Sequence, residues 1–145
     1  MLAQNLKVLL STQFAYGIKT QFFHWNVEGS DFGQLHDFFG TLYTDAFGAI
    51  DPIAEYIRTL DEYAPGSLTR FSEMTLVEDQ LRIPSATLML QETLKDTETI
   101  LGLLKQTFDD ANAEGKDGIA DFLAGRLDIH GKWRWQLKAY LKNKQ

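Results

Sequence analysis

The 145-residue chain has the composition of an ordinary globular protein, with 44% apolar and 23% charged residues. Its length fits one domain, residues 1–145, and suffices to bury a core without covalent staples. It contains no cysteine, which excludes disulfides and thiolate metal sites and suits a reducing compartment. No apolar run approaches the ~20 residues that cross a bilayer, and the N-terminus lacks a signal-peptide pattern. We therefore expect a cytoplasmic protein with no membrane segment.

The net charge of −6 is distributed unevenly along the chain. Residues 126–145 carry six cationic residues against one acidic residue, a net charge of +5, so the first 125 residues sum to −11. An acidic body repels nucleic acid and attracts cations. The basic end either contacts an anion or, as we favour, complements the dipole of a last helix and solubilises its surface.

The hydrophobic pattern is helical throughout, and it begins with a first helix over about residues 3–27. Ser30 or Asp31 caps a second helix, which extends to about residue 60 and carries the strongest apolar stripe. Three aromatic residues widen that stripe: Phe38, Tyr43 and Phe47. The second helix therefore has two apolar faces, which is typical of a helix that forms an oligomer contact.

Pro52 interrupts the second helix. It removes one backbone hydrogen bond and presses on the carbonyl of residue 48, where a glycine eases the crowding. Either Asp51 caps a new helix with Pro52 at its first position, or one long helix bends at residues 48–52. Because the stripe continues on both sides, we favour the bent helix.

A long connection follows over residues 61–84, punctuated by Ala64-Pro65-Gly66-Ser67 and Ile83-Pro84-Ser85. Within it, Thr75–Leu81 is expected to hold one or two helical turns. A connection of this length can run along a bundle and join the second and third helices as parallel neighbours.

Two more helices are expected over about residues 85–112 and 117–142, separated by a turn at residues 114–118. Four long helices, one long crossover and no strand predict an all-α, ferritin-like four-helix bundle.

Four residues are candidate metal ligands: His24, His36, Asp51 and Glu55. Imidazole nitrogen and carboxylate oxygen, without sulfur, suit borderline-hard first-row metals, with iron prominent among them. The common di-iron centre inside one bundle needs Glu-x-x-His on two helices, and the chain has no such motif. A straight helix would separate His36 from Asp51 by roughly 22 Å. These residues are therefore either unrelated or shared between two copies of the chain.

An intersubunit site follows if the second helices of two chains pack antiparallel across a two-fold axis near residues 44–46. Position 36 of one chain then lies beside positions 51–55 of the other, and His24 reaches the same place from the end of the first helix. The prediction is two equivalent sites per dimer. Each would combine His24 and His36 of one chain with Asp51 and Glu55 of the other.

The run HWNVEGSDFGQLHDFF, with the spacing to DPIAE, resembles the Dps family of mini-ferritins (DNA-binding proteins from starved cells). The resemblance extends to Ala64-Pro65-Gly66, Ile119–Leu123 and Trp133-Arg134-Trp135. It implies a hollow dodecamer that binds ferrous iron at dimer interfaces and stores ferric mineral inside. It also implies ferroxidase activity, with hydrogen peroxide preferred over dioxygen as oxidant and no organic cofactor. Each of the four candidate ligands matches a family ligand position: His24, His36, Asp51 and Glu55.

One departure from the family pattern concerns the metal site. Gly40 stands where the family usually has Asp, four residues after the second histidine. Asp37 lies about 60° around the helix from position 40 and is a poor substitute. Losing a carboxylate is expected to weaken at least one iron position and to leave one ion bound at rest. The alternative function is therefore a metal-storing shell with a degraded oxidation site.

A second departure concerns DNA. Family members that bind DNA often carry a Lys-rich tail, but the first 30 residues contain only Lys7 and Lys19. The expected C-terminal tail, Asn143-Lys144-Gln145, is short. Because neutralising phosphates needs several accessible cations, strong DNA binding or compaction is not expected.

The resemblance gives roles to three further residues, and each has a plainer explanation. Trp25 either intercepts oxidising equivalents beside His24 or simply packs. Asp117 and Asp121 either line pores that draw cations inward or act as favourable charges at a helix N-terminus. His130 matches no ligand position and is expected to be structural. Three carboxylates are expected to be solvated or capping: Asp31, Asp37 and Asp45.

Overall fold

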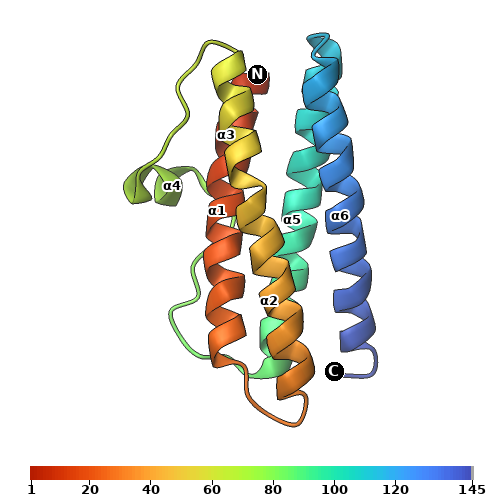
Figure 1. Cartoon of the computed structure of the whole chain (residues 1–145). Helices are drawn as coiled ribbons and strands as arrows, with labels where there is room; N and C mark the ends of the chain where they lie inside the picture. The colour runs from red at the N-terminus through yellow and green to blue at the C-terminus, as the bar shows by residue number, and fades with distance from the viewer. Residues whose placement is uncertain (145) are drawn as a thin grey trace.

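The computed structural model describes residues 1–144, which form six helices and no strand. Gln145, the last residue of the expected tail, lies outside this range. The helices are α1 (Leu2–Asn26), α2 (Phe32–Gly48), α3 (Ile50–Thr59), α4 (Leu68–Met74), α5 (Ala86–Ala113) and α6 (Asp117–Leu141). The long helices stand side by side as a bundle, and α4 lies outside it (Figure 1). The predicted all-α bundle with a long crossover is confirmed.

Helices α2 and α3 form one bent element. Ala49 alone separates them and keeps a helical conformation, with φ −83° and ψ −13°. Its N–H donates to the carbonyl of Asp45 and its carbonyl accepts from Ile53, both at 3.2 Å. Pro52 is the third residue of α3, so Asp51 does not cap a new helix. The bent-helix prediction is therefore confirmed, and the two segments run on along one side of the bundle in Figure 1.

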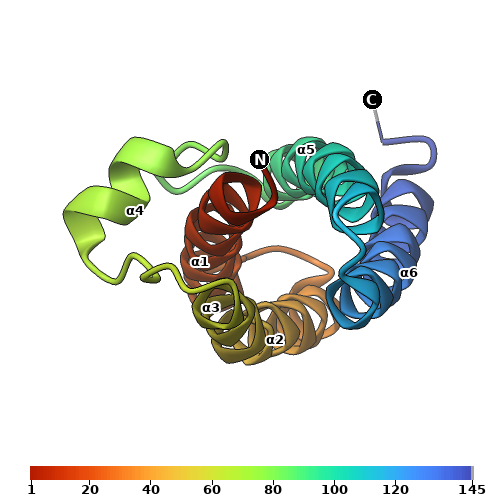
Figure 2. The same cartoon turned by 90° about the horizontal axis from the view of Figure 1, so that it is seen from above.

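Seen along its axis, the bundle is a ring in which α1 is followed by α3 and α2, then α6, then α5 (Figure 2). Helices α1 and α6 run in one direction, and α2, α3 and α5 run in the other (Figure 1). The crossover thus does join parallel helices. The expectation that they are neighbours is wrong, because α5 lies diagonally across the ring from α2.

The short helix of the crossover, α4, begins earlier than predicted. Ser67 caps it by accepting a hydrogen bond from the N–H of Arg70 at 3.2 Å. Phe71 packs against Phe14 of α1, with ring centroids 4.6 Å apart. This contact holds α4 against the outside of the bundle.

The segment Thr75–Leu81 is not helical, so the prediction of helical turns there is wrong. Thr12 of α1 accepts at its hydroxyl from the N–H of Leu76 at 3.0 Å. Lys19 of α1 donates to the carbonyl of Glu78, also at 3.0 Å. Side chains of α1 thus satisfy backbone groups that a local helix would otherwise pair.

The second apolar face of α2 is partly used inside the chain. Phe47 packs on Phe14 with ring centroids 6.0 Å apart. A Cβ on Gly17 would lie 2.7 Å from the Phe47 ring, so the glycine permits the close approach of α1 and α2. No helix within residues 1–144 has both the length and the apolar character needed to cross a bilayer.

Candidate functional site

His24 and His36 lie face to face where α1 ends and α2 begins. Their ring centroids are 3.9 Å apart and their planes differ by 15°. Nδ1 of His24 is 2.6 Å from the carbonyl oxygen of His36, and Nδ1 of His36 is 2.7 Å from the carbonyl oxygen of His24. Both side chains are half-buried. The structure therefore brings these two predicted residues together and binds each to the backbone of the other.

These reciprocal hydrogen bonds determine which ring nitrogens are available. A carbonyl oxygen only accepts, so each Nδ1 carries a proton and donates it. In a neutral imidazole the lone pair is then on Nε2, which is the form in which histidine binds a metal. A metal ion lies in the plane of the imidazole that binds it. Because the two planes are nearly parallel, one ion could not lie in the plane of both rings.

Aromatic side chains flank the histidine pair. The Phe32 ring lies 5.2 Å from that of His36, at an interplanar angle of 22°. The Tyr43 ring lies 5.2 Å from that of His24. These contacts restrict the rotation of both imidazoles, so the pair is preorganised.

The two candidate carboxylates stand apart from the histidines. Asp51 is in the first turn of α3, and both it and Glu55 are exposed. Their spacing of four residues puts them on the same side of α3. Within residues 1–144 of one chain, no group of three or more His, Asp or Glu side chains is placed to hold a metal ion. Their contribution from a second chain therefore stays a prediction.

The remaining candidates are at the surface. Trp25 is 63% exposed, so packing within one chain does not account for it. Asp117 and Asp121 are exposed near the start of α6. Their positions suit a pore lining and a helix N-terminus equally well.

A second polar cluster, which the sequence reasoning missed, lies at the centre of the bundle. Arg126 of α6 is 6% exposed and donates to both carboxylate oxygens of Asp45 on α2, at 3.1 and 2.8 Å. Trp133 donates to the same carboxylate at 3.3 Å. Burial raises the pKa of Asp45, but the hydrogen bonds and charge of Arg126 outweigh burial and hold it below its usual value. The expectation that Asp45 is solvated or capping is wrong.

His130 lies one turn after Arg126 and is 1% exposed. Its Nδ1 donates to the carbonyl of Arg126 at 2.9 Å, and within the described residues its Nε2 has no hydrogen-bond partner. Burial, together with the charge of Arg126, lowers the pKa of His130 to about 4. The imidazole is therefore neutral at pH 7, in keeping with the structural role expected of it.

Tyr16 completes the buried cluster. Its hydroxyl is 2.7 Å from that of Thr97, which itself donates to the carbonyl of Thr93 at 2.7 Å. Tyr16 is therefore the donor to Thr97, and burial raises the pKa of its phenol well above the ordinary value. Most polar groups at the centre of the bundle pair with one another, and Arg126 supplies a cation there.

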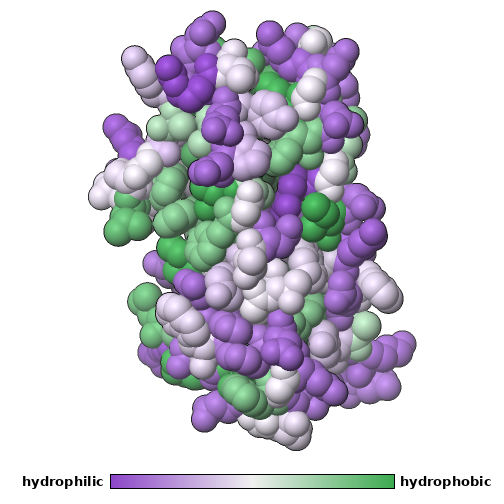
Figure 3. Space-filling model, viewed as in Figure 1, coloured by the Kyte–Doolittle hydropathy of each residue, from purple (hydrophilic) through white to green (hydrophobic). Residues whose placement is uncertain are grey.

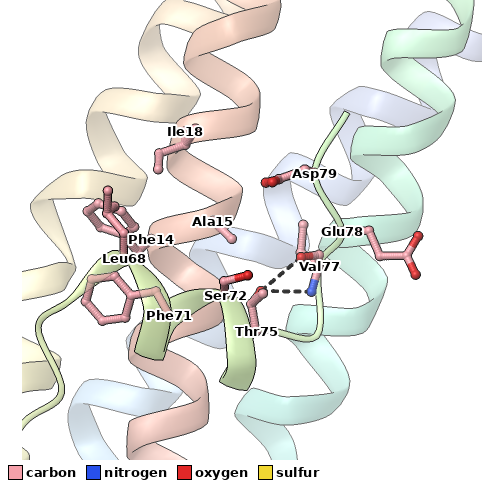
Figure 4. Close-up of a pocket in the computed structure, with 10 residues that line it drawn as sticks. All are labelled: Phe14, Ala15, Ile18, Leu68, Phe71, Ser72, Thr75, Val77, Glu78 and Asp79. Atoms are coloured by element: carbon pink, nitrogen blue, oxygen red, sulfur yellow. Dashed lines mark hydrogen bonds between the residues drawn. The ribbon is translucent and has the colours of Figure 1, made fainter. Parts of the chain in front are cut away.

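A hollow of about 530 Å³ lies between α1 and α4, and none of the candidate ligands lines it (Figure 4). Its apolar wall combines Phe14 and Ile18 of α1 with Leu68 and Phe71 of α4. Apolar residues, drawn green, gather over this part of the molecule at the left of Figure 3. Leu68 is 72% exposed and Ile18 is 41% exposed.

Comparison with known proteins defines the class of this bundle. Residues 3–145 match the family model described as Ferritin, ferritin-like domain. The chain is 32% identical to the DNA protection during starvation protein of Brevibacillus brevis, over 96% of each chain.

Two solved structures narrow the class. The crystal structure of a Dps protein from Bacillus brevis matches with a TM-score of 0.93 at 29% identity, covering 97% of this chain and 94% of that one. Dps from Vibrio cholerae O1 matches with a TM-score of 0.92 at 25% identity, covering 97% and 88%, and is described as a member of a broad superfamily of ferritin-like diiron-carboxylate proteins. The chain therefore belongs to the Dps family, as the residues around its histidines predict.

Proposed function

We propose that copies of this chain assemble into a shell that binds ferrous iron between subunits, oxidises it and stores the ferric product, which protects against oxidative damage. The observation that carries the proposal is the His24–His36 pair, in which Nδ1 of each imidazole is hydrogen-bonded and, among the described residues, Nε2 is not. Membership of the Dps family supports iron as the metal, since a member 25% identical to this chain is described as a ferritin-like diiron-carboxylate protein.

Each site would combine His24 and His36 of one subunit with Asp51 and Glu55 of another. Two neutral imidazoles and two carboxylates carry a charge of −2, which balances one ferrous ion. Carboxylates stabilise ferric iron more than ferrous iron because the attraction grows with the charge of the ion. The donor set therefore favours oxidation of the bound ion.

The reaction consumes two ferrous ions for each hydrogen peroxide. Each ion gives one electron, the O–O bond breaks, and two protons complete two water molecules. The nearly parallel rings of His24 and His36 suit two neighbouring ion positions. With Gly40 in place of a family carboxylate, one position has a donor fewer, so one ion is bound at rest and the second binds during turnover. Dioxygen is the alternative oxidant.

Self-association is supported by the apolar surface around α4. Leu68 and Ile18 border the hollow in Figure 4 and are well exposed in the single chain. A second copy of the chain is the occupant that the intersubunit site requires. The family resemblance implies twelve subunits, with Asp117 and Asp121 lining the entry for cations and Trp25 intercepting oxidising equivalents at the site.

Anaerobic ferrous titration followed by hydrogen peroxide, with ferric absorbance as the readout, tests the proposal. We expect rapid ferric formation in the wild type and a large loss in the His24→Ala/Asp51→Ala double variant. Glu98→Ala removes an exposed carboxylate that pairs with Arg134, and it is the matched control. Equal rates of ferric formation in the wild type and the double variant would contradict the proposed ferroxidase activity.

A shell that stores metal without oxidising it is the second candidate, and Gly40 is the observation that favours it. It predicts ferrous binding by the wild type with no acceleration of ferric formation by peroxide. DNA compaction is disfavoured by the charge of −11 on the first 125 residues. We expect no gel retardation of DNA at low or at moderate salt, and a clear shift at moderate salt would contradict this.

A further inference from the structure

We propose that Gly40 is a positioning residue for His24, and that a side chain at position 40 would displace the His24 ring from its place in the histidine pair. This inference deepens the proposed function and rests on it. On this inference, Gly40 contributes to an imidazole-based site for divalent first-row ions, and its role is more than the absence of a carboxylate ligand.

The first observation is a close approach between α1 and α2. A Cβ placed on Gly40 would lie 2.9 Å from Cε1 and 3.0 Å from Nδ1 of His24. Packed atoms do not tolerate such distances without movement. Every residue other than glycine carries this atom, so any other residue at position 40 requires the His24 ring to move.

The second observation is that the His24 ring is held in place by its other contacts. Its Nδ1 donates to the carbonyl of His36 at 2.6 Å, and its face stacks on the His36 ring at 3.9 Å. Tyr43 lies 5.2 Å away, centroid to centroid. The carbonyl of His36 belongs to the helical turn that precedes Gly40. A ring pushed away from position 40 therefore also leaves its hydrogen-bond acceptor.

Other glycines of the same helix show that this approach is specific to position 40. A Cβ on Gly33 or on Gly48 would meet no atom within 4 Å. Gly33 is also exposed, so it supplies a matched substitution in α2 that leaves the histidine pair untouched.

The donor set follows from this geometry. With position 40 bare, this chain presents two fixed imidazoles with free Nε2 atoms, and the anionic donors come from the partner alone. A site with fewer carboxylates discriminates less in favour of trivalent ions, while imidazole suits Co²⁺, Zn²⁺ and Fe²⁺ alike. The inferred ligand class is thus a divalent first-row cation.

The test is a Co²⁺ titration of the assembled, metal-free protein followed by visible absorption. Relative to the wild type, we expect Gly40→Ala and Gly40→Asp to bind Co²⁺ about tenfold more weakly, which is the usual effect of disturbing the residues that orient a ligand. Gly33→Ala should bind as the wild type does. Tighter binding by Gly40→Asp, or unchanged binding by Gly40→Ala, would overturn the positioning role.

Crystal structures of metal-free Gly40→Ala and Gly40→Asp give a readout that does not depend on iron chemistry. The expected result is a displaced His24 whose Nδ1 no longer reaches the carbonyl of His36. A His24 that keeps this hydrogen bond beside a side chain at position 40 would refute the inference while leaving the proposed oxidation intact. Conversely, failure of peroxide-dependent oxidation in the wild type would not alter the position of the imidazole in these variants.

Discussion

The bundle contains two histidine clusters with opposite properties. The His24–His36 pair is half-buried and holds its Nδ1 atoms on backbone carbonyls, and neither Nε2 atom is hydrogen-bonded within residues 1–144. In the second cluster, His130 and Arg126 are buried and Asp45 is half-buried, and the cluster contains its own cation and its own anion. The difference teaches that charge balance within one chain distinguishes a structural polar cluster from the proposed ion-binding pair.

The largest expected effect comes from unbalancing the buried cluster. Asp45→Ala leaves the Arg126 guanidinium without its carboxylate and should lower the free energy of unfolding by about 4 kcal/mol. Denaturant unfolding of the metal-free protein measures it. The exposed pair of Arg134 and Glu98 is the control, and Arg134→Ala should change stability by less than about 0.5 kcal/mol. Similar losses in the two variants would erase the contrast between buried and exposed charge.

The pKa of His130 gives the next effect. The unfolded histidine takes up a proton near pH 6.5, whereas the folded one resists until about pH 4. Between these values the unfolded state binds more protons, so stability falls as the pH drops, by about 3 kcal/mol in total. The lowered pKa of Asp45 adds a separate loss at still lower pH, below its unfolded value of 3.8.

Denaturant unfolding at several pH values between 7 and 4 tests this dependence. His130→Gln should flatten the profile relative to the wild type, because the difference between the two proteins isolates the contribution of His130. Parallel profiles would show that His130 is not the titrating group.

Metal binding should stabilise the folded protein only through the His24–His36 pair. Free Co²⁺ at 100 times its Kd is expected to stabilise the wild type by about 2.7 kcal/mol. His36→Ala should abolish this gain, and a chelator should reverse it in the wild type. His130→Gln should retain the gain, measured as the shift in Tm on adding Co²⁺ at pH 7. Its loss in His130→Gln would mean that the two clusters are coupled.

The smallest effect concerns Tyr16. Tyr16→Phe removes the hydrogen bond to Thr97, but the Thr97 hydroxyl still donates to the carbonyl of Thr93. No buried donor is orphaned, so the cost should be about 1 kcal/mol in denaturant unfolding. Tyr63→Phe, at a residue 82% exposed, should have no measurable effect. A much larger cost for Tyr16→Phe would place this phenol in a network with the neighbouring charges.

The sequence predicted what depends on local pattern. The four long helices follow from apolar periodicity, and the bend follows from a continuous stripe across Pro52. The error in the predicted position of the short helix also has a local cause. Ser67 is a recognisable N-cap for α4, but the helical turns were predicted in the next segment, Thr75–Leu81, whose backbone hydrogen-bonds to side chains of α1 instead.

The buried cluster escaped because its partners are far apart along the chain. Asp45 and Arg126 are separated by 81 residues, and no local spacing links them. One signal was present, since Arg126 falls on the inward face of a helix, and a buried arginine requires an acidic partner. The proposed role of Gly40 could not be predicted from the sequence either. The sequence shows only that a family ligand is missing at position 40, whereas the structure shows the His24 ring packed against it.

The bend at Ala49 has a mechanical consequence. It sets the angle between the helix segment that carries His36 and the segment that carries Asp51 and Glu55. In the proposed two-fold pair of chains, the same angle recurs in each subunit, and each proposed site takes donors from both segments. A change of backbone conformation at Ala49 would therefore change the separation of the donors in both proposed sites, although Ala49 is not itself a proposed ligand.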